Sequence, residues 1–303
     1  MENNVSIIMS VLNGEATIKK CLDSIFQQSY NSIDIVICDD GSHDNSYSII
    51  ETYSKLNRRF NISILRNEKN IGLPASLNRC IEGAKGPFLA RMDADDQMLA
   101  NRILHQVQYL EKNNSIDIVG GSQLMFFRGG GSRINRPPAD DHLIKAGLFI
   151  RTTMLHPTIM LRKDFLEKNS IRYDPKYHLC EDYKLFIDLL YAGANFANIP
   201  EVVNTYDYST AKSWDKHQDV MVNALKELWG GNLQKIGMKC REKHLRYFLQ
   251  ATGKVKIYQK GNLFNIFFFF VTCTFSNKGL FGGVFSFIYM RMKDIRSVIF
   301  RKN

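Results

Sequence analysis

The chain has 303 residues, of which 45% are hydrophobic and 23% are charged, the balance of an ordinary globular protein. This length allows one large α/β domain with an appendage or two modest domains, and the composition excludes a disordered or fibrous protein. The six cysteines include no Cys-x-x-Cys pair, which excludes a zinc ribbon or a disulfide framework and is typical of a reducing compartment. The polar start of the chain predicts that no signal peptide is present.

The net charge of +10 is carried by the C-terminal end of the chain. Residues 239–303 contain 13 lysines and arginines against 2 aspartates and glutamates, whereas residues 1–238 contain 27 against 28. A basic segment of this kind can bind nucleic acid or an anionic membrane. Two apolar runs in the same segment, at 263–275 and 280–290, are each shorter than the roughly 20 residues of a spanning helix.

These apolar runs favour a membrane surface over nucleic acid as the partner of the segment. The first run contains four consecutive phenylalanines, at 267–270, whereas surfaces that bind nucleic acid interleave aromatic with basic side chains. Apolar segments framed by lysine and arginine suit a helical hairpin on an anionic leaflet. The alternative is a pair of core helices that cap the rest of the protein. We therefore predict that residues 262–303 associate with a membrane, and we expect no nucleic-acid partner.

The first hundred residues alternate between short apolar runs and segments with helical spacing. The runs predict strands and the segments predict helices: strands at 5–12, 33–38, 62–65 and 88–92, and helices at 16–28, 46–56 and 73–84. Such alternation predicts an α/β fold with a mostly parallel sheet and right-handed crossovers. Ligands bind sheets of this kind outside the carboxyl ends of the strands.

Later residues predict further helices and strands without an internal repeat. Helices are expected at 102–112, 143–150, 181–192 and 215–236, a strand at 116–119 and a short edge strand at 202–208. Three consecutive glycines begin a basic stretch at 129–138, which predicts a surface loop.

Three carboxylates fall within four residues directly after the predicted strand at 88–92. Asp93, Asp95 and Asp96 repel one another unless a positive charge lies between them. In extended or turn geometry Asp93 and Asp95 point to the same side, and hard oxygen ligands suit Mg²⁺ or Mn²⁺. The alternative is a solvated acidic turn. The position of the cluster after an apolar strand that carries Arg91 favours the metal site.

Two further acidic pairs are candidates for chemistry. Asp39 and Asp40 follow a predicted strand and precede Gly41, which is typical of a β-turn but also places a carboxylate where it can accept from a uracil imide or a ribose hydroxyl. Glu181 and Asp182 begin a predicted helix, where acidic residues favour the helix dipole. Near a metal–diphosphate site, a carboxylate there can instead act as a general base.

Six motifs in this order resemble the family 2 glycosyltransferases with the GT-A fold, over residues 5–210. They are Val5–Glu15, Asp39–Ser42, Asn67–Leu73, Ala90–Asp96, His156–Thr158 and Glu181–Tyr183. The bacterial members that add single sugars to lipopolysaccharide, O-antigen or capsule repeat units are the most similar. The resemblance implies a Rossmann-like catalytic domain at 1–212, with a nucleotide-binding half at 1–100 and an acceptor-binding half at 101–212. A helical, basic and apolar extension follows at 213–303.

The resemblance also implies a role for each matching residue. The expected nucleotide pocket has Asp39 on the uracil, Asp40 in support of the turn, and Ser10, Leu12, Glu15, Arg66, Asn70 and Gly72 around the base and ribose. The expected phosphate and sugar side has Asp95 on a Mn²⁺ or Mg²⁺ ion, Asp93 on the ribose or the metal, and Arg91 and Asp96 on the donor sugar or ordering the loop. The expected acceptor side has Asp182 as the base, Glu181 beside it on the substrate, and His156 either on the acceptor or phosphate or buried as a structural residue.

The implied reaction is transfer of one hexose from a UDP-sugar, with inversion, to a lipid-linked or oligosaccharide acceptor on the cytoplasmic face of a bacterial inner membrane. A divalent cation neutralises the diphosphate leaving group and a carboxylate takes the acceptor proton. One alternative is a nucleotidyltransferase of similar fold, although the glycine-rich basic loop of that class is missing after the first strand. Another is a non-catalytic module that binds nucleic acid, which leaves the carboxylates unexplained. A dinucleotide dehydrogenase is excluded because no Gly-x-Gly-x-x-Gly follows a strand. The oligomeric state stays open.

Overall fold

The computed structural model describes residues 4–148, 152–208 and 218–235. The chain separates into two compact units, one formed by 1–139 and 154–213 and the other by 140–153 and 214–303. In the described part of the second unit lie α5 (Asp141–Leu148) and α8 (Gln218–Lys235). The predicted domain boundary after residue 212 stays a prediction, and the predicted membrane-associated segment at 262–303 lies outside the described residues.

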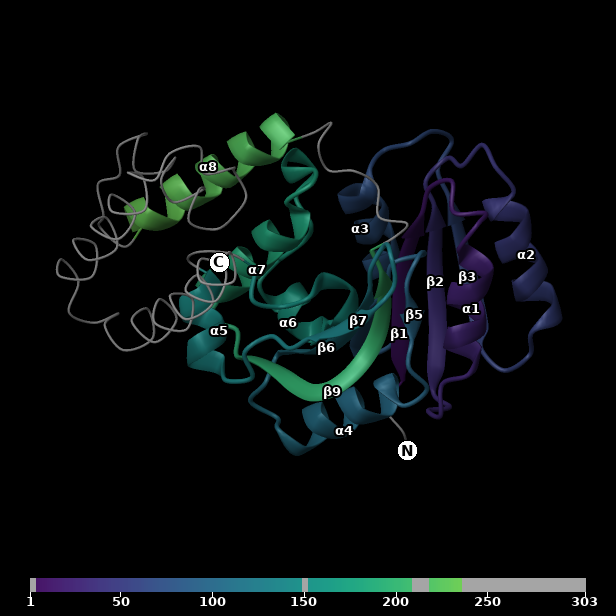
Figure 1. The fold of residues 1–303 in the computed structure, drawn as a ribbon, viewed down its shortest axis with the longest axis horizontal. Helices are drawn as coiled ribbons and strands as arrows, with labels where there is room; N and C mark the ends of the chain where they lie inside the picture. Colours follow the sequence, from purple (N-terminus) through teal and green to yellow (C-terminus); the bar gives the residue numbers. More distant parts are fainter. Residues whose placement is uncertain (1–3, 149–151, 209–217, 236–303) are drawn as a thin grey trace. The chain divides into compact units, whose positions relative to one another are not determined.

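In the described part of the first unit, nine strands form one sheet in the order β3-β2-β1-β4-β8-β6-β9-β5, with β7 paired to β6 (Figure 1). The strands are β1 (Val5–Val11), β2 (Ile33–Asp39), β3 (Asn61–Arg66), β4 (Phe88–Arg91), β5 (Gln97–Met98), β6 (Ile118–Phe126), β7 (Ser132–Asn135), β8 (Met160–Arg162) and β9 (Phe196–Asp207). Strands β1 to β4 are parallel. Their carboxyl ends therefore meet at one edge of the sheet, where ligands bind in α/β folds.

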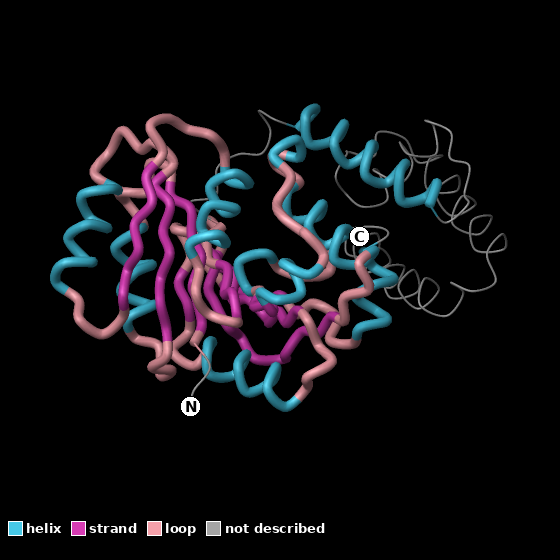
Figure 2. The backbone as a smooth tube through the Cα atoms, turned by 180° about the vertical axis from the view of Figure 1, so that it is seen from behind, coloured by secondary structure: helices cyan, strands magenta, loops and turns pink. Residues whose placement is uncertain are grey.

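Helices cover both faces of the parallel strands (Figure 2). Those of the first unit are α1 (Ile18–Phe26), α2 (Ser46–Leu56), α3 (Leu73–Gly83), α4 (Arg102–Lys112), α6 (Lys163–Lys168) and α7 (Glu181–Tyr191), with short 3₁₀ turns at His156–Thr158 and Pro175–Tyr177. Burial on both faces explains the sequence of β1, in which Val5, Ile7 and Met9 alternate with Ser6 and Ile8, and all five side chains are buried.

The second half of the sheet curves away from the parallel strands because of β9 (Figure 1). β9 runs parallel to β6 from Ile118↔Phe196 to Phe126↔Asp207, with register shifts on either side of Ser122. Bulges of this kind bend a strand and increase its twist. The far end of β9 pairs with β5, the two-residue strand that follows Asp96 in the chain. The acidic segment after β4 is thus tied to a strand that lies more than 100 residues later.

The structure confirms the predicted alternation of strands and helices over the first 112 residues, with shifts of one or two residues at most ends. Two predictions were wrong. The glycine-rich stretch contains β7, which pairs with β6 as a hairpin, and the segment at 202–208 is the end of a twelve-residue strand that lies between β6 and β5 rather than at an edge. Both errors arise because pairing partners, rather than local periodicity, decide whether an irregular segment forms a strand.

None of the described helices is both long enough and apolar enough to cross a bilayer.

At Gly41 the turn after β2 packs closely against the backbone of the loop after β3. Its φ of +73° lies in the left-handed region, and a Cβ atom there would lie 2.7 Å from the backbone carbon of Lys69 and 2.8 Å from the backbone nitrogen of Asn70. Neither the turn nor the loop can shift without moving the strand ends that carry Asp39 and Arg66.

We expect Gly41→Ala to lower the free energy of unfolding by at least about 2 kcal/mol, because positive φ and a backbone clash add. Gly130→Ala is the matched control: its φ is +92°, but no atom lies within 4 Å of the added Cβ. The control should cost only about 1 kcal/mol. Urea unfolding followed by circular dichroism measures both, and equal losses would show that the contact with Lys69 is unimportant.

Candidate active site

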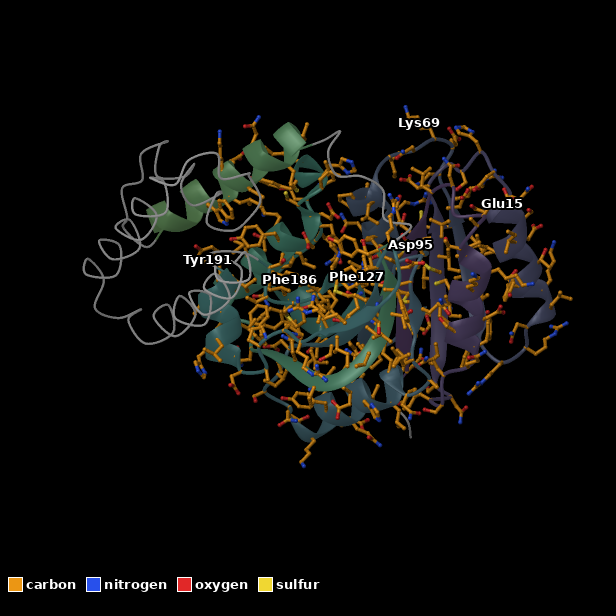
Figure 3. All side chains as sticks on the ribbon, viewed as in Figure 1. Glu15, Lys69, Asp95, Phe127, Phe186 and Tyr191 are labelled. Atoms are coloured by element: carbon orange, nitrogen blue, oxygen red, sulfur yellow. The ribbon has the colours of Figure 1, made fainter. Side chains whose placement is uncertain are left out.

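Three strand ends form the floor of the candidate site. The parallel pairing of β1 with β2 and with β4 brings Val11, Asp39 and Arg91 to the same edge of the sheet. The residues that follow these strands in the chain are therefore neighbours in space. Sequence reasoning predicted this edge as the ligand site, and the labelled Asp95 and Glu15 lie on loops at it (Figure 3).

Asp39 is a buried carboxylate without a hydrogen bond. Its side chain is 0% exposed, and neither carboxylate oxygen accepts a hydrogen bond from the described residues. The Nε atom of Arg66 lies 3.4 Å from Oδ2 of Asp39, and the Arg66 guanidinium lies 4.1 Å from the centre of the Tyr47 ring. A buried acceptor that lacks donors is unfavourable, so it is a strong indication of a ligand that supplies N–H or O–H groups.

Asp40, the next residue, is also buried, but both of its carboxylate oxygens accept hydrogen bonds. Oδ1 accepts from the side chain of Asn67 at 2.7 Å and from the backbone N–H of Ile71 at 2.9 Å, and Oδ2 accepts from the backbone N–H of Gly72 at 2.9 Å. The side chain of Asn70 accepts a further bond from Gly72 N–H, at 2.9 Å. Asp40 therefore fixes the 67–72 loop beside the exposed face of Arg66.

The loop after β1 is held against the start of α2 by polar contacts. Glu15 accepts from the side chain of Asn45 at 2.7 Å and from its backbone N–H at 3.2 Å. Ser10 is half-buried near the end of β1, and Leu12 is 36% exposed at the start of the loop. These three residues lie at the predicted edge, and Glu15 organises the loop through Asn45.

Arg91 and Asp93 form an ion pair at the end of β4. The two terminal nitrogens of Arg91 lie 2.5 and 2.6 Å from the two oxygens of Asp93, the geometry of a bidentate pair. Arg91 is buried and Asp93 is partly exposed. Tyr173, which the sequence did not single out, lies close enough to Arg91 for the guanidinium to act on its pKa, although burial dominates and raises that pKa.

The other two carboxylates after β4 differ in exposure. Asp96 is buried and accepts from the side chain of Asn204 at 2.8 Å and of Gln123 at 3.5 Å. Burial, together with the charges of Asp93 and Asp95, raises the pKa of Asp96 to about 9. Asp95 is exposed. Of the two expected roles of Asp96, the structure shows contacts that order the loop against β6 and β9.

The residues present fit a Mg²⁺ or Mn²⁺ ion that is bound together with substrate phosphates. Within the described ranges no group of three or more His, Cys, Asp or Glu side chains converges on one point. Mg²⁺ commonly uses only one or two carboxylates and completes its shell with phosphate and water oxygens. The exposed Asp95 and the partly exposed Asp93 would supply the hard oxygen donors of such a site.

The start of α7 brings Glu181 and Asp182 to the same region. The backbone N–H of Tyr183 donates to the Asp182 carboxylate at 2.6 Å, and Glu181 has a buried oxygen, Oε2, that no described donor reaches. Burial and the neighbouring Asp182 charge raise the pKa of Glu181 to about 7, which the charge of Arg91 partly counteracts. Arg91 is therefore paired with the acidic loop and close enough to the start of α7 for its charge to act there.

His156 is buried, and its Nε2 atom lies 2.7 Å from the hydroxyl of Tyr173. Burial lowers the pKa of His156 well below its usual value, and the charge of Arg91 acts in the same direction. His156 is thus a neutral side chain that is hydrogen-bonded to Tyr173. Of its two expected roles, this environment favours that of a buried structural residue. Tyr173 gives little signal in the sequence because a single tyrosine between apolar and charged residues is common.

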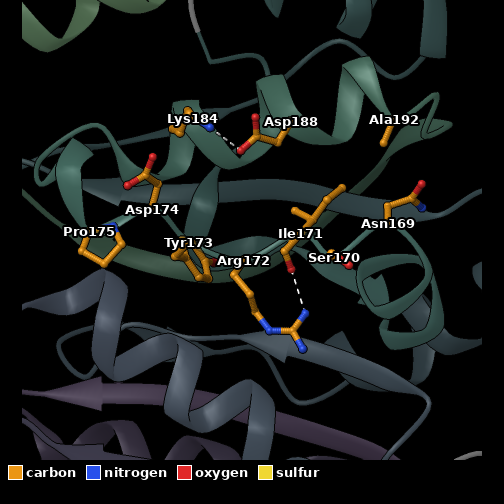
Figure 4. A pocket seen from close by; sticks show the side chains of 10 residues that line it. All are labelled: Asn169, Ser170, Ile171, Arg172, Tyr173, Asp174, Pro175, Lys184, Asp188 and Ala192. Carbon is orange, nitrogen blue, oxygen red and sulfur yellow. Dashed lines mark hydrogen bonds and ion pairs between the residues drawn. The ribbon is translucent and has the colours of Figure 1, made fainter.

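A pocket of about 560 Å³ has Tyr173 in its lining (Figure 4). It is lined by the segment 169–175 and by Lys184, Asp188 and Ala192 of α7 and its end. Lys184 is paired with Asp188 at 2.6 Å. Arg172, also in the lining, is paired with Glu167 at 2.8 Å, and the predicted site residues are not among the residues that line the pocket.

Comparison with known proteins gives a consistent result. The family described as glycosyl transferase family 2 matches residues 6–170, more than half of the chain. The putative glycosyltransferase EpsE of Bacillus subtilis is 31% identical over 202 residues, which cover 66% of this chain and 71% of EpsE. The UDP-Glc:alpha-D-GlcNAc-diphosphoundecaprenol beta-1,3-glucosyltransferase WfgD of Escherichia coli is 28% identical over 186 residues, covering 61% of this chain and 69% of WfgD.

Solved structures share the fold at low sequence identity. Residues 1–349 of S. aureus TarS, solved with UDP-GlcNAc, superpose with a TM-score of 0.64 at 16% identity, covering 89% of this chain and 80% of that one. The mannosyltransferase PcManGT of Pyrobaculum calidifontis, solved with GDP-Man and Mn²⁺, gives a TM-score of 0.60 at 13% identity, covering 94% and 79%. The likeness shows the fold alone, and it confirms the GT-A fold predicted from the sequence.

The raised pKa of Glu181 predicts a pH-dependent stability. The folded state binds this proton more tightly than the unfolded chain, whose carboxyl has a pKa near 4.5, so the contribution is complete below that pH and is lost as the pH rises through about 7. Glu181→Gln keeps the shape without the charge. We expect the wild type to lose on the order of 2 kcal/mol of unfolding free energy between pH 5 and 8 relative to the variant.

Urea unfolding at pH 5, 6, 7 and 8 measures this difference. Glu82→Gln, at an exposed glutamate of the same unit, is the control and should follow the wild type. Parallel curves for the wild type and Glu181→Gln would show that Glu181 titrates normally.

Proposed function

Because the chain belongs to glycosyl transferase family 2, we propose that it transfers a single hexose from a UDP-sugar, with inversion, to a lipid-linked glycan of a bacterial surface polysaccharide. Family membership favours glycosyl transfer over both alternatives, nucleotidyl transfer and a non-catalytic module that binds nucleic acid. WfgD, by its name, takes UDP-Glc and a diphosphoundecaprenol-linked sugar, and TarS was solved with UDP-GlcNAc. These relatives support the choice of donor and of a polyprenyl-diphosphate acceptor.

The buried Asp39 carboxylate carries the assignment of a uracil nucleotide. The imide N–H of uracil is a donor of the kind that the Asp39 oxygens lack. Arg66, which lies 3.4 Å from Asp39 and is 55% exposed at its side chain, can donate to a uracil carbonyl oxygen. Cytosine carries an acceptor in place of the imide N–H, so it would set a lone pair against the carboxylate.

Asp93 and Asp95 would hold a Mn²⁺ or Mg²⁺ ion, which when bound supplies positive charge to the diphosphate leaving group. Asp93 is oriented for this by its bidentate pair with Arg91. Asp96 anchors the acidic loop through Asn204, so that Asp95 is held at the surface. Through these contacts the two carboxylates would hold the cation whose positive charge compensates the diphosphate.

Asp182 would take the proton of the acceptor hydroxyl as it attacks the anomeric carbon. A single displacement from the side opposite to the leaving group inverts the anomeric centre and gives a β-glycoside from an α-linked donor. Glu181 would accept a hydrogen bond from a hydroxyl of a bound sugar at its buried Oε2 atom, to which none of the described residues donates. Both carboxylates stand at the N-terminus of α7, where the helix dipole favours negative charge.

We further propose that the enzyme works at the cytoplasmic face of the bacterial inner membrane. A polyprenyl-linked acceptor is confined to the bilayer, so a peripheral enzyme gains by residing there. The basic and apolar segment at 262–303 would supply this attachment. Deletion of these residues should release the protein from membranes if that assignment is correct.

Calorimetric titration of UDP tests the donor assignment. In the presence of Mn²⁺ we expect micromolar binding that is selective for UDP over GDP and CDP and that weakens at least about tenfold when Asp39→Ala removes the acceptor. Asp95→Ala should abolish the dependence on Mn²⁺ without changing the selectivity for uracil. Glu68→Ala, at an exposed position of the 67–72 loop, is the control. Failure of the folded wild type to bind any nucleotide would overturn the proposal.

Asp182→Asn tests the base. The amide cannot take a proton but keeps the shape, so we expect UDP binding within about twofold of the wild type and a loss of transfer of at least about 100-fold. Transfer is measured as release of UDP from UDP-glucose in the presence of membranes that contain the acceptor lipid. Asp188→Asn, six residues further along α7, is the matched control. Transfer by Asp182→Asn at the wild-type rate would assign the base elsewhere.

A further inference from the structure

An aromatic row lies at the ends of β6 and β9, outside every residue assigned above. It consists of Phe127, Tyr206 and Tyr208. The rings of Phe127 and Tyr208 are stacked, with centroids 5.7 Å apart and an interplanar angle of 27°, and Tyr206 meets Tyr208 edge-on at 5.4 Å. Phe127 is 38% and Tyr208 46% exposed. Large rings that pack on one another while one face stays open to solvent often mark a binding surface.

Strand register places this row on the face that anchors the acidic loop. Asn204 and Gln123 are direct partners across β9 and β6, and both side chains bond Asp96. Side chains of a strand alternate between faces, so Tyr206 and Tyr208 follow Asn204 on the same face, at steps of about 7 Å. The backbone N–H of Tyr208 donates to the carbonyl oxygen of Phe126 at 2.8 Å, which extends the pairing to the end of the row.

The row therefore begins beside the acidic loop. The charges of Asp95, Asp96 and Asp93 reach Tyr206 and, together with burial as the main cause, raise its pKa to about 12. The Tyr206 hydroxyl consequently stays protonated and can donate a hydrogen bond. Figure 3 labels Phe127 and Asp95, the two positions that bracket this stretch of the face.

We propose that Phe127 and Tyr208 form a stacking platform for a pyranose ring of the acceptor glycan, with the Tyr206 hydroxyl at its inner edge. This inference rests on the proposed function. The apolar face of a β-hexopyranose carries axial C–H groups that pack on an aromatic ring, and its rim of hydroxyls needs polar partners. Rings with a few placed polar groups are the usual lining of a ligand site.

The inner end of the row favours a sugar over an anionic membrane as the occupant, whereas the outer end carries the exposed Arg128 next to Phe127. Asp207 follows Tyr206 and is exposed, and Asp93, Asp95 and Asp96 lie next to the inner end of the row. Negative charges at this end oppose contact with an anionic leaflet but leave a neutral sugar unaffected. The row is also continuous, through Asn204, with the loop that the proposed donor site uses.

Saturation-transfer NMR with methyl β-D-glucopyranoside, on the full chain saturated with UDP and Mn²⁺, tests the platform. We expect transfer to be strongest at H1, H3 and H5, the protons of one face of the ring. The double variant Phe127→Ala/Tyr208→Ala should lower these signals about fivefold or more. Tyr208→Phe keeps the ring and should retain the signals.

Phe126→Ala is the matched control because Phe126 is 42% exposed, precedes Phe127 and points to the opposite face of β6. Wild-type signals in the double variant, an equal loss in Phe126→Ala, or no signals in the wild type would each overturn the platform. Sedimentation with phosphatidylglycerol vesicles tests the alternative that the rings contact an anionic membrane. Loss of vesicle binding in the double variant, with sugar signals unchanged, would assign the rings to a membrane.

UDP titration of the same samples keeps the two proposals apart. Unchanged UDP affinity in the double variant shows that it is folded and that the donor site is intact, so a lost sugar signal then belongs to the platform. A wild type that shows ring-dependent sugar signals without binding UDP would keep the sugar subsite and reject the proposed donor.

Discussion

The ion pair between Arg91 and Asp93 is the interaction on which the rest of the site depends. A buried guanidinium is unfavourable unless a carboxylate compensates it, and loss of one partner leaves an unpaired charge in the interior. The pair is fixed at the end of β4, where the carbonyl oxygen of Arg91 accepts from a second buried arginine, Arg102, at 2.7 Å. Its field also reaches His156 and Glu181, so one charge relates the acidic loop to the start of α7.

Adjacent carboxylates have different environments in this protein. The carboxylate of Asp40 accepts hydrogen bonds from the 67–72 loop. Asp39 beside it is buried, and its carboxylate accepts no hydrogen bond from the described residues. Asp96 is buried and accepts a hydrogen bond from Asn204, whereas its neighbour Asp95 is exposed. In each pair one carboxylate is hydrogen-bonded within the protein, and under the proposed function the other would contact a ligand from a backbone that is already ordered, which reduces the ordering that binding requires.

The long strand β9 gives the two sides of the site a common support. Its middle anchors Asp96 through Asn204, and its end carries Tyr206 and Tyr208. The bulges near Ser122 curve this strand toward β5 and so bring the aromatic row to the acidic loop. Under the two proposals, groups of the donor side and of the acceptor side would share this one strand and so be held in a fixed relation, which is what a displacement reaction requires.

The sequence by itself determined the alternating strands and helices of the first half and the three acidic clusters at their ends, because apolar periodicity and strand ends are local properties. Only the tertiary structure decided that Asp40 is hydrogen-bonded to the 67–72 loop, whereas the oxygens of Asp39 accept no hydrogen bond from the described residues. It also decided the aromatic row, because Phe127 and Tyr208 meet through pairing of strands that are about 80 residues apart and bent by bulges. Such long-range register has no signature in local composition.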